Sequence, residues 1–453
     1  MDIYKYINKY IIAPLYYLKH SDERVKQSDI LEKNQYLTTK DLNSLALKKI
    51  QAIVTHAYKT TPYYRNLLDS NGIKPEDIKG FSDFNKIPIL TKNNIQNNLH
   101  DMKSDCYSDN DMLQDASGGS TGEPTVFYRD KQSYQFRAAD QIRHDRWSGW
   151  DRGERIALIW GAQRDLKASQ SIREHVISRY ISRMWELDAF DMSQENMKKY
   201  ARTLEKVQPQ MILGYANALV IFSEYILKHH PDHKIAVKGI ISSAETLTEE
   251  KRATIEKAFH CKVLNRYGSR EVGLIASECK SQKGLHINFD NLYVEVVNDG
   301  QPVEDGEFGD ILVTDYNNKG MPLIRYKLGD VGRLSSKVCD CGRTLPLLES
   351  IEGRNGDFFV AQDGSLVHGE YFTHLFYGIE DISKFQVIQE NMNETYIKIV
   401  TSNEDVNSEN IQNIITKTKG ILGKNCRVII QFVTDIPKTS SGKYIFTISK
   451  VRS

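Results

Sequence analysis

The sequence predicts an α/β fold in which a large N-terminal region is followed by a small α+β domain. Between about residues 127 and 330, short apolar runs alternate with amphipathic runs, as in a parallel sheet with helices between its strands. After about residue 290 the runs become β-rich, with Gly, Asn and Asp at the turns. The last hundred residues follow a third pattern. A chain of 453 residues is also too long for one compact core.

The first 20 residues, MDIYKYINKYIIAPLYYLKH, are aromatic and basic. They contain no long apolar core and no small-residue cleavage site, so they do not resemble a signal peptide. Two roles stay open for this predicted helix: packing on its own domain, or weak interfacial contact with a membrane. We expect no transmembrane segment, because no run approaches the roughly 20 apolar residues that span a bilayer.

Residues 41–75 are predicted to be helical. The stretch DLNSLALKKIQAIVTHAY places apolar side chains at near-helical spacing, and Asp41 or Thr39 is expected to cap it. The apolar positions are Leu45, Leu47, Ile50, Ile53 and Val54.

The central region is predicted to form a doubly wound parallel sheet. The expected buried strands are 155–160, 210–215, 238–245 and 261–268, and the expected helices between them include 192–206 and 216–230. The stretches YVEVVNDG, GDILVTDY and DVGRLSS then predict antiparallel hairpins or a small barrel-like part.

The C-terminal region is predicted to be a small α+β domain. KFQVIQE, ETYIKIV and CRVIIQFV alternate like half-buried strands, with a helix near 407–420 between the second and the third. Glycines loosen the backbone at EGRNGD. We therefore expect a large domain over 1–353, a hinge at 354–357 and a small mobile domain over 358–453.

The composition limits the class of protein. Hydrophobic residues make up 40% and charged residues 26%, as in globular proteins, and the net charge of +1 with no basic stripe argues against nucleic-acid binding. Six cysteines without a secretion signal indicate a reducing compartment, so we expect a cytoplasmic protein without disulfides. The oligomeric state stays open.

One polar stretch, SGGSTGEP, stands between two hydrophobic segments. Glycines let backbone N–H groups approach an anion, and hydroxyl groups add donors, so such a loop can hold a polyphosphate. It is not a Walker A motif, because the spacing and the lysine of that motif are missing. By itself the stretch is more typical of a surface turn.

Three further stretches, in order, change that interpretation: NRYGSRE (265–271), MPLIRYKLGD (321–330) and PKTSSGK (437–443). With the glycine-rich loop they resemble the adenylate-forming superfamily of acyl-CoA synthetases. More narrowly, the chain resembles the phenylacetate–CoA ligase branch and its CapK-like capsule-biosynthesis relatives. That resemblance runs from about residue 40 to the end and includes HAYKTTPYYR, IPILTK, YGSREVG, CDCGR and IEGR.

The resemblance implies attack of a carboxylate on the α-phosphate of ATP, which yields an acyl-adenylate and pyrophosphate. Such chemistry is mostly positioning and charge neutralisation. The residues implied for the β- and γ-phosphates are Ser117, Gly118, Gly119, Ser120, Thr121 and Gly122.

The resemblance also assigns the other roles at the nucleotide. Tyr267, with Gly268, would lie against the adenine, and Asp330 would accept hydrogen bonds from the ribose. Glu271 would ligate Mg²⁺, which prefers oxygen ligands. Lys443 would approach the α-phosphate and the substrate carboxylate.

The hinge departs from the family pattern. In the superfamily the small domain rotates between the two half-reactions, and the joint commonly reads GR-x-D. Here Gly353-Arg354-Asn355 is followed by Gly356, and Asp357 comes one position later. This leaves open which residue is the hinge. Arg354 is expected to reach the nucleotide or the hinge.

Four residues form a complete ligand set for structural Zn²⁺: Cys279, His286, Cys339 and Cys341. Three thiolates and an imidazole suit tetrahedral zinc, and a closed site of this kind does not catalyse. Similar sets occur in this branch of the family. The alternative is four unrelated reduced residues.

The leading functional hypothesis is an acid–CoA ligase that uses ATP, Mg²⁺ and CoA. A second hypothesis passes the acyl group to an amine or hydroxyl, such as that of a sugar in capsule polysaccharide biosynthesis. A third is a non-catalytic nucleotide-binding protein. The expected small-molecule partners are a carboxylic acid and CoA or another acyl acceptor. The sequence does not identify the acid.

Overall fold

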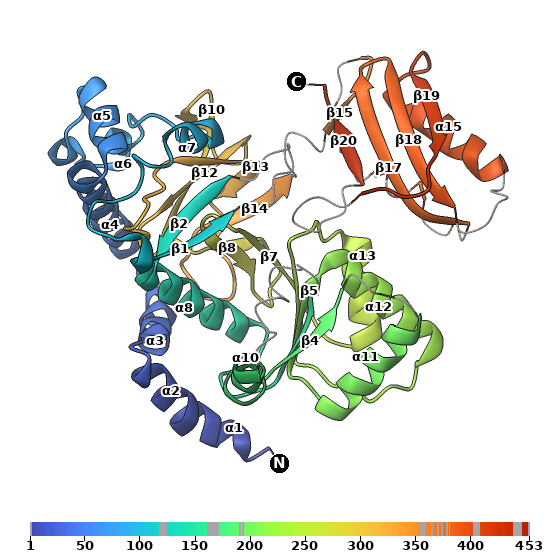
Figure 1. Cartoon of the computed structure of the whole chain (residues 1–453), viewed down its shortest axis with the longest axis horizontal. Helices are drawn as coiled ribbons and strands as arrows, with labels where there is room; N and C mark the ends of the chain where they lie inside the picture. Colours follow the sequence, from blue (N-terminus) through green and yellow to red (C-terminus); the bar gives the residue numbers. More distant parts are fainter. Residues whose placement is uncertain are drawn as a thin grey trace. The chain divides into compact units, whose positions relative to one another are not determined.

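The computed structural model describes residues 2–116, 125–160, 172–189, 192, 194–352, 358–363, 366–368, 371–372, 375–376, 379, 381–401, 408–437 and 446–451 (Figure 1). The chain divides into two compact units. The larger is built mainly from residues up to 350, and the smaller mainly from residues 351–453. The predicted hinge at 354–357 lies outside the described residues.

Helices dominate the first hundred residues of the larger unit. They are α1 (Tyr4–Ile7), the π-helix η1 (Asn8–Ile12), α2 (Ala13–Lys19), α3 (Arg24–Asn34), α4 (Thr39–Thr60), α5 (Pro62–Ser70), η2 (Pro75–Asp77), α6 (Phe81–Phe84) and α7 (Lys92–Asn98). A short η3 (Asp109–Asp111) precedes the antiparallel pair β1 (Met112–Ala116) and β2 (Val126–Asp130).

The helix predicted over 41–75 is two helices, and its predicted cap was wrong. Thr61 is extended and Pro62 starts α5, because proline lacks the N–H that would continue α4. The cap is Thr38, whose hydroxyl accepts from the Asp41 N–H at 3.2 Å. Ile50, Ile53 and Val54 are buried as expected, whereas Leu45 and Leu47 are half-buried.

Five parallel strands form one end of a 12-stranded sheet, in the order β7-β6-β5-β3-β4. Their bounds are β3 (Ile156–Trp160), β4 (Met184–Asp188), β5 (Met211–Tyr215), β6 (Gly239–Ser243) and β7 (Val263–Ser269). The helices of this region are α8 (Lys131–Trp147), α10 (Ile172–Val176), η4 (Ile177–Ser182), α11 (Gln194–Val207), α12 (Ala216–His229) and α13 (Glu249–Phe259). This confirms the predicted parallel sheet; β4 was not anticipated.

The parallel strands are short and apolar because both of their faces are covered. One face contributes to a core with α11, α12 and α13, which includes Ile159, Ile212 and Phe222. The alternate residues Ile156, Met211 and Leu213 pack in a second cluster with Trp150. The carboxyl ends of these strands are therefore held in place by packed side chains on both faces of the sheet.

The predicted β-rich part is the antiparallel end of the same sheet. Beyond β7 the strands follow in the order β8-β9-β14-β13-β12-β10-β11. They are β8 (Gly273–Glu278), β9 (Leu285–Ile287), β10 (Leu292–Asn298), β11 (Gln301–Pro302), β12 (Phe308–Asp315), β13 (Tyr326–Ser335) and β14 (Leu347–Glu352). The ladder is continuous with the parallel end and is not a separate barrel among the described strands.

The smaller unit is an α+β domain, as predicted. It holds the hairpin β15 (Phe358–Val360) and β16 (Leu366–His368), and a four-stranded sheet in the order β19-β18-β17-β20. Its elements are β17 (Ile382–Asn391), β18 (Glu394–Thr401), α15 (Ser408–Leu422), β19 (Arg427–Phe432) and β20 (Thr447–Ser449). Its own core includes Phe359, Phe372, Ile397, Ile399 and Ile414.

Strand β7 joins the two halves of the large sheet. It pairs in parallel with β6 and antiparallel with β8, and the pairing shifts register between Tyr267 and Gly268. At Gly268 a Cβ atom would lie 2.6 Å from the backbone oxygen of Gly273. Only glycine therefore fits the close approach of these two chains.

We predict that Gly268→Ala destabilises the larger unit. The added methyl group forces a backbone shift, which costs on the order of 2 kcal/mol by analogy with overpacked cores. The midpoint of thermal unfolding should fall by about 3 °C. Gly80→Ala is the control, because the nearest atom to its Cβ lies 3.9 Å away. Equal melting of both variants would contradict the steric argument.

Candidate active site and metal centre

The glycine-rich loop, residues 117–122, lies outside the described residues, but the strands at its base are described. β1 and β2 pair in register up to Ala116 and Val126, so the loop connects the two strands of a hairpin. At this end Asp115 forms an ion pair with Arg129, and its Oδ1 lies 3.7 Å from Nη1 of Arg270. The base of the loop is therefore adjacent to the NRYGSRE turn.

The NRYGSRE stretch forms the end of β7 and the turn to β8: Tyr267 and Gly268 lie in β7, and Glu271 lies in the turn. Tyr267 is half-buried, Gly268 is exposed and Glu271 is only 4% exposed. Arg137 of α8 holds the turn from inside. Its guanidinium donates to the carbonyl oxygen of Arg270 at 3.0 Å and to that of Glu271. Sequence reasoning did not find this role, because no local signal links Arg137 to a turn 133 residues away.

The Glu271 carboxylate is buried next to a neutral partner. The hydroxyl of Tyr326, from β13, donates to its Oε1 at 3.2 Å. Among the described residues no cation forms an ion pair with this carboxylate. A buried carboxylate is costly without a compensating charge. The Glu271 carboxylate is therefore chemically suited to bind a cation that enters the site together with a ligand.

The neighbouring Arg325 explains why Tyr326 is in place. Its backbone is left-handed, with φ of 50°. Its buried guanidinium lies 3.0 Å from Glu295 and donates to the carbonyl oxygens of Asn85 and Ile87. The arginine of PLIRYKLGD is thus a structural anchor that the motif alone did not reveal.

Asp330 lies further along β13. It is half-buried and follows Gly329, whose φ is +84°. A glycine accepts this conformation without strain, which lets the strand bend immediately before the carboxylate. The two remaining predicted nucleotide residues, Arg354 and Lys443, lie outside the described residues.

The carboxyl edge of the parallel strands carries aromatic side chains. Trp160 ends β3 and Tyr215 ends β5, and their rings pack with centroids 4.0 Å apart. Next to them, Glu245 accepts a hydrogen bond from the backbone N–H of Asn217 at 2.8 Å. In open α/β sheets, ligands bind outside this edge. The turn of Glu271 follows β7 at the same edge.

The four predicted metal ligands come together, although they are far apart in the sequence. Their ligand atoms all lie within 4.8 Å of one another. Cys279 directly follows β8, His286 lies in β9, and Cys339 and Cys341 lie between β13 and β14. Because β9 pairs with both β8 and β14, the sheet itself brings the ligands to one place.

Two of the separations are close to those around one tetrahedral zinc ion. Ordinary Zn–S and Zn–N bonds give S···S and S···N distances of roughly 3.8 and 3.6 Å. Here the sulfurs of Cys279 and Cys339 are 3.7 Å apart, and Cys341 Sγ lies 3.3 Å from His286 Nε2. His286 Nδ1 lies 3.4 Å from the carbonyl oxygen of Leu345, which orients the ring as in known metal sites.

Burial shifts the pKa values of two members of this cluster, His286 and Cys279. It lowers the pKa of His286 to about 4, so the imidazole is neutral near pH 7, as a ligand must be. Burial and the neighbouring thiols raise the pKa of Cys279 to about 11. A bound cation would favour the thiolate of Cys279 near neutral pH. Burial also acts to raise the pKa of Cys341, but hydrogen bonds from Arg343 outweigh it and hold that pKa below its ordinary value. All six cysteines are free.

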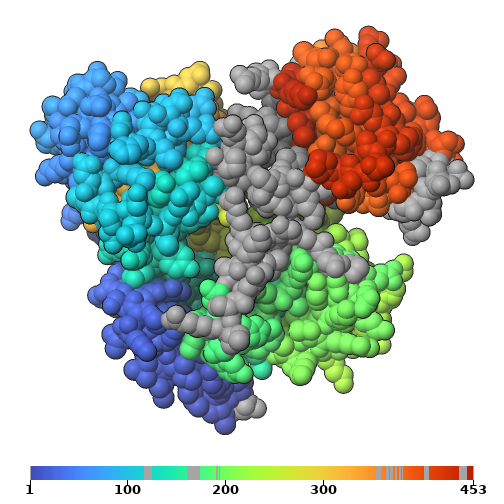
Figure 2. All heavy atoms as spheres, in the orientation of Figure 1, coloured from blue at the N-terminus to red at the C-terminus, as the bar shows by residue number. Residues whose placement is uncertain are grey.

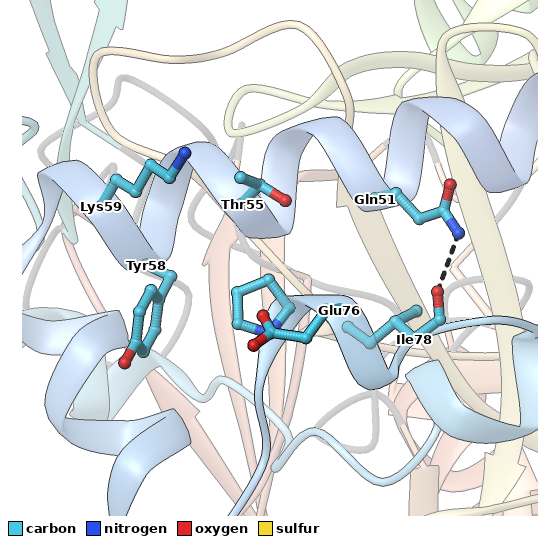
Figure 3. Close-up of a pocket in the computed structure, with 7 residues that line it drawn as sticks. Gln51, Thr55, Tyr58, Lys59, Glu76 and Ile78 are labelled. Atoms are coloured by element: carbon cyan, nitrogen blue, oxygen red, sulfur yellow. Dashed lines mark hydrogen bonds between the residues drawn. The ribbon is translucent and has the colours of Figure 1, made fainter.

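A surface hollow of 380 Å³ lies elsewhere, between α4 and η2 (Figure 3). Gln51, Thr55, Tyr58 and Lys59 line one side, and Gln51 donates to the carbonyl oxygen of Ile78 at 2.8 Å. None of the predicted site residues that the structure describes lines this hollow.

Known proteins resemble this chain over most of its length. The family described as the CapK C-terminal domain matches residues 359–450. Protein CapK of Staphylococcus aureus is 26% identical over 440 residues, which cover 96% of this chain and 94% of CapK. The phenylacetate–coenzyme A ligase of Escherichia coli (strain K12) is 28% identical over 328 residues, which cover 71% of this chain and 72% of the ligase.

Solved structures share the fold. A 2-hydroxyisobutyryl-CoA ligase in the postadenylation state, in complex with 2-HIB-AMP, is similar with a TM-score of 0.69 at 17% identity, over 92% of this chain and 91% of the ligase. An open conformation of the same ligase gives a TM-score of 0.61 at 18% identity, over 91% and 92%. The chain is thus similar to CapK over nearly its whole length and to the phenylacetate–coenzyme A ligases over about 70% of it, and it shares the fold of a CoA ligase.

Proposed function

We propose that the protein activates a carboxylic acid with ATP and passes the acyl group to CoA. In the first step a carboxylate oxygen forms a bond to the α-phosphorus, and the bond from that phosphorus to the bridging oxygen breaks. Pyrophosphate leaves and an acyl-adenylate remains. In the second step the thiol displaces AMP and loses its proton. The observation that carries this proposal is the NRYGSRE turn, held by Arg137 beside the base of the glycine-rich loop.

The roles of the residues follow from their chemistry. The loop from Ser117 to Gly122 would hold the β- and γ-phosphates with backbone N–H groups, since it starts and ends on paired strands. Tyr267 and Gly268 would lie against the adenine. Asp330 would accept hydrogen bonds from the ribose hydroxyls. Lys443 would stabilise the charge that develops as the adenylate forms.

Glu271 would hold Mg²⁺. The ion supplies charge neutralisation at the phosphates. The fit rests on the buried carboxylate, which receives a hydrogen bond from Tyr326 at 3.2 Å and has no ion-pair partner among the described residues. Tyr326 keeps one oxygen oriented, so the carboxylate need not reorganise when the metal nucleotide binds.

The acyl acceptor has a second candidate, an amine or hydroxyl group. The similarity to the E. coli phenylacetate–CoA ligase spans 328 residues, whereas the similarity to CapK spans 440. The smaller unit also matches the CapK C-terminal family over 359–450. In this superfamily the small domain acts in the transfer step. The similarity of this domain to CapK is therefore the reason to keep an amine or hydroxyl group as the alternative acceptor.

Pyrophosphate release from ATP across a panel of carboxylic acids, with and without CoA, tests the proposal. We expect one class of acid to trigger release, and a thioester to accumulate only when CoA is present. Release without a thioester would instead support the amine or hydroxyl acceptor. ATP binding without release for any acid in an aliphatic, hydroxylated and aromatic panel would contradict the ligase proposal.

The two charged residues should fail in different ways. Lys443→Ala should lower acid-dependent ATP–pyrophosphate exchange by roughly a hundredfold or more and leave ATP affinity nearly unchanged. Glu271→Gln should lower exchange to a similar degree and also raise the Mg²⁺ concentration needed for half-maximal rate. Lys424→Ala, at an exposed lysine of the smaller unit, is the control. Normal exchange by Lys443→Ala would refute the assigned role.

The cluster of Cys279, His286, Cys339 and Cys341 would bind one structural Zn²⁺. Its fit rests on the ligand distances and on the carbonyl that orients His286. Four protein ligands complete a tetrahedron, so the ion would pin the segment between β13 and β14 to the sheet and take no part in catalysis.

Metal analysis of the purified full chain should therefore find about one zinc per chain. Cys339→Ser should remove it and lower the melting temperature, because a structural ion contributes directly to folding. Cys106→Ser, at an exposed cysteine outside the cluster, should keep the metal. A chain purified without chelators that holds no zinc, and whose stability is unchanged by Cys339→Ser, would rule out the site.

A further inference from the structure

The N-terminal helical segment, α1-η1-α2, docks on the larger unit through polar groups. The side-chain amide of Asn8 is 1% exposed and donates to the carbonyl oxygens of Tyr180 and Ile181, at 2.7 and 3.1 Å. These carbonyls end the π-helix η4 and would otherwise lack partners. The hydroxyl of Tyr4 also donates to the Tyr180 carbonyl, at 3.0 Å.

Ion pairs continue the same inner face. Lys5 lies 3.3 Å from Glu154, and Lys9 forms an ion pair with Asp151. Asp2, just before the helix, lies 2.8 Å from Arg183. The segment is therefore fastened to its own domain by hydrogen bonds and charges.

The outer face of the segment is apolar, which reverses the usual arrangement of a surface helix. Ile7, Ile11 and Leu15 follow one another at spacings of four residues and are 41%, 54% and 61% exposed. We call the whole set the N-terminal apolar stripe: Ile3, Tyr6, Ile7, Tyr10, Ile11, Leu15 and Leu18. Val176 and Tyr180, on the neighbouring α10 and η4, are 46% and 59% exposed.

Such a contiguous apolar surface marks a contact site, whereas single exposed apolar residues do not. The dark-blue N-terminal segment lies at the surface of the larger unit in the space-filling view (Figure 2). Leaving these side chains in water is unfavourable, while the polar inner face holds the helix so that they stay outside. The stripe is thus presented for a partner outside this chain.

Charge and side-chain type identify the partner. Residues 3–20 contain three lysines, one histidine and no acidic residue. Lys5 and Lys9 pair with Glu154 and Asp151 on the inner face, so Lys19 and His20 are the basic side chains left exposed. A helix with an apolar face, tyrosines and lysines is suited to the boundary between lipid headgroups and acyl chains. Lys19 is exposed at the end of α2 and complements an anionic surface. The length from Tyr4 to Lys19, at 1.5 Å per residue, is about 24 Å.

We propose that the N-terminal apolar stripe docks the protein onto an anionic lipid surface, with α1-η1-α2 lying in the plane of that surface. No described helix is long and apolar enough to cross a membrane. The proposed contact is peripheral. It does not depend on the proposed ligase activity, because none of the residues in the stripe belongs to the nucleotide site.

Vesicle sedimentation of the full chain tests this proposal. The probes are vesicles of phosphatidylglycerol and phosphatidylcholine in equal parts, and vesicles of phosphatidylcholine alone. We expect the protein to bind the anionic vesicles, with an affinity that falls as salt rises, and to bind the neutral vesicles more weakly. The double variant Ile11→Glu/Leu15→Glu should bind the anionic vesicles at least about tenfold more weakly than the unaltered chain, because two anchoring side chains become anionic.

Ile221→Glu/Phe432→Glu is the matched control. Both residues are exposed, at 43% and 62%, lie outside the stripe and receive the same change in charge. This variant should bind like the unaltered chain. Far-ultraviolet circular dichroism and pyrophosphate release should be unchanged for both variants, which shows that the effect is not unfolding.

Three results would overturn the proposal. The unaltered chain could stay in solution with both vesicle types, or the stripe variant could bind as well as the control. In the third result, the unaltered chain would not bind vesicles. Sedimentation equilibrium would instead show that it is a dimer and that Ile11→Glu/Leu15→Glu converts it to a monomer. The stripe would then be an interface between two copies.

Discussion

The rest of the structure depends on one close approach, that of β7 to β8 at Gly268. Here the sheet changes from parallel to antiparallel, and the two backbones come so near that no side chain fits between them. The same approach sets the turn that buries Glu271 and places β8, which leads directly to Cys279. Both candidate sites are thus built outward from a single hairpin.

The two sites use that support differently. At the candidate nucleotide site, Arg137 holds the backbone carbonyls of the turn and Tyr326 donates to the buried carboxylate of Glu271, which has no ion-pair partner among the described residues. At the candidate metal centre the four side chains that could ligate an ion lie within 4.8 Å of one another, and burial lowers the pKa of His286 to about 4.

The N-terminal segment shows that amphipathic periodicity does not decide which face is buried. Asn8, Lys5 and Lys9 find carbonyl and carboxylate partners on the larger unit, and these contacts outweigh the packing that the apolar side chains could have gained there. A polar group buried with its partners costs little, whereas one buried alone costs several kcal/mol. The sequence left both roles of this segment open.

Local patterns determined much of this protein from the sequence alone. Alternating and continuous apolar runs were enough to predict most of the parallel strands and the small α+β domain, because the period and the burial of an element show in the order of consecutive residues. The four candidate metal ligands were selected from residue type, spacing and the family resemblance, and the structure brings them together. Tertiary structure decided the rest. Three residues have roles that depend on partners 30 to 240 residues away: Arg137, Tyr326 and Arg325. The helix cap is Thr38, where Asp41 or Thr39 was expected. Long-range partners have no local signature, since side-chain geometry is set only when the sheet assembles.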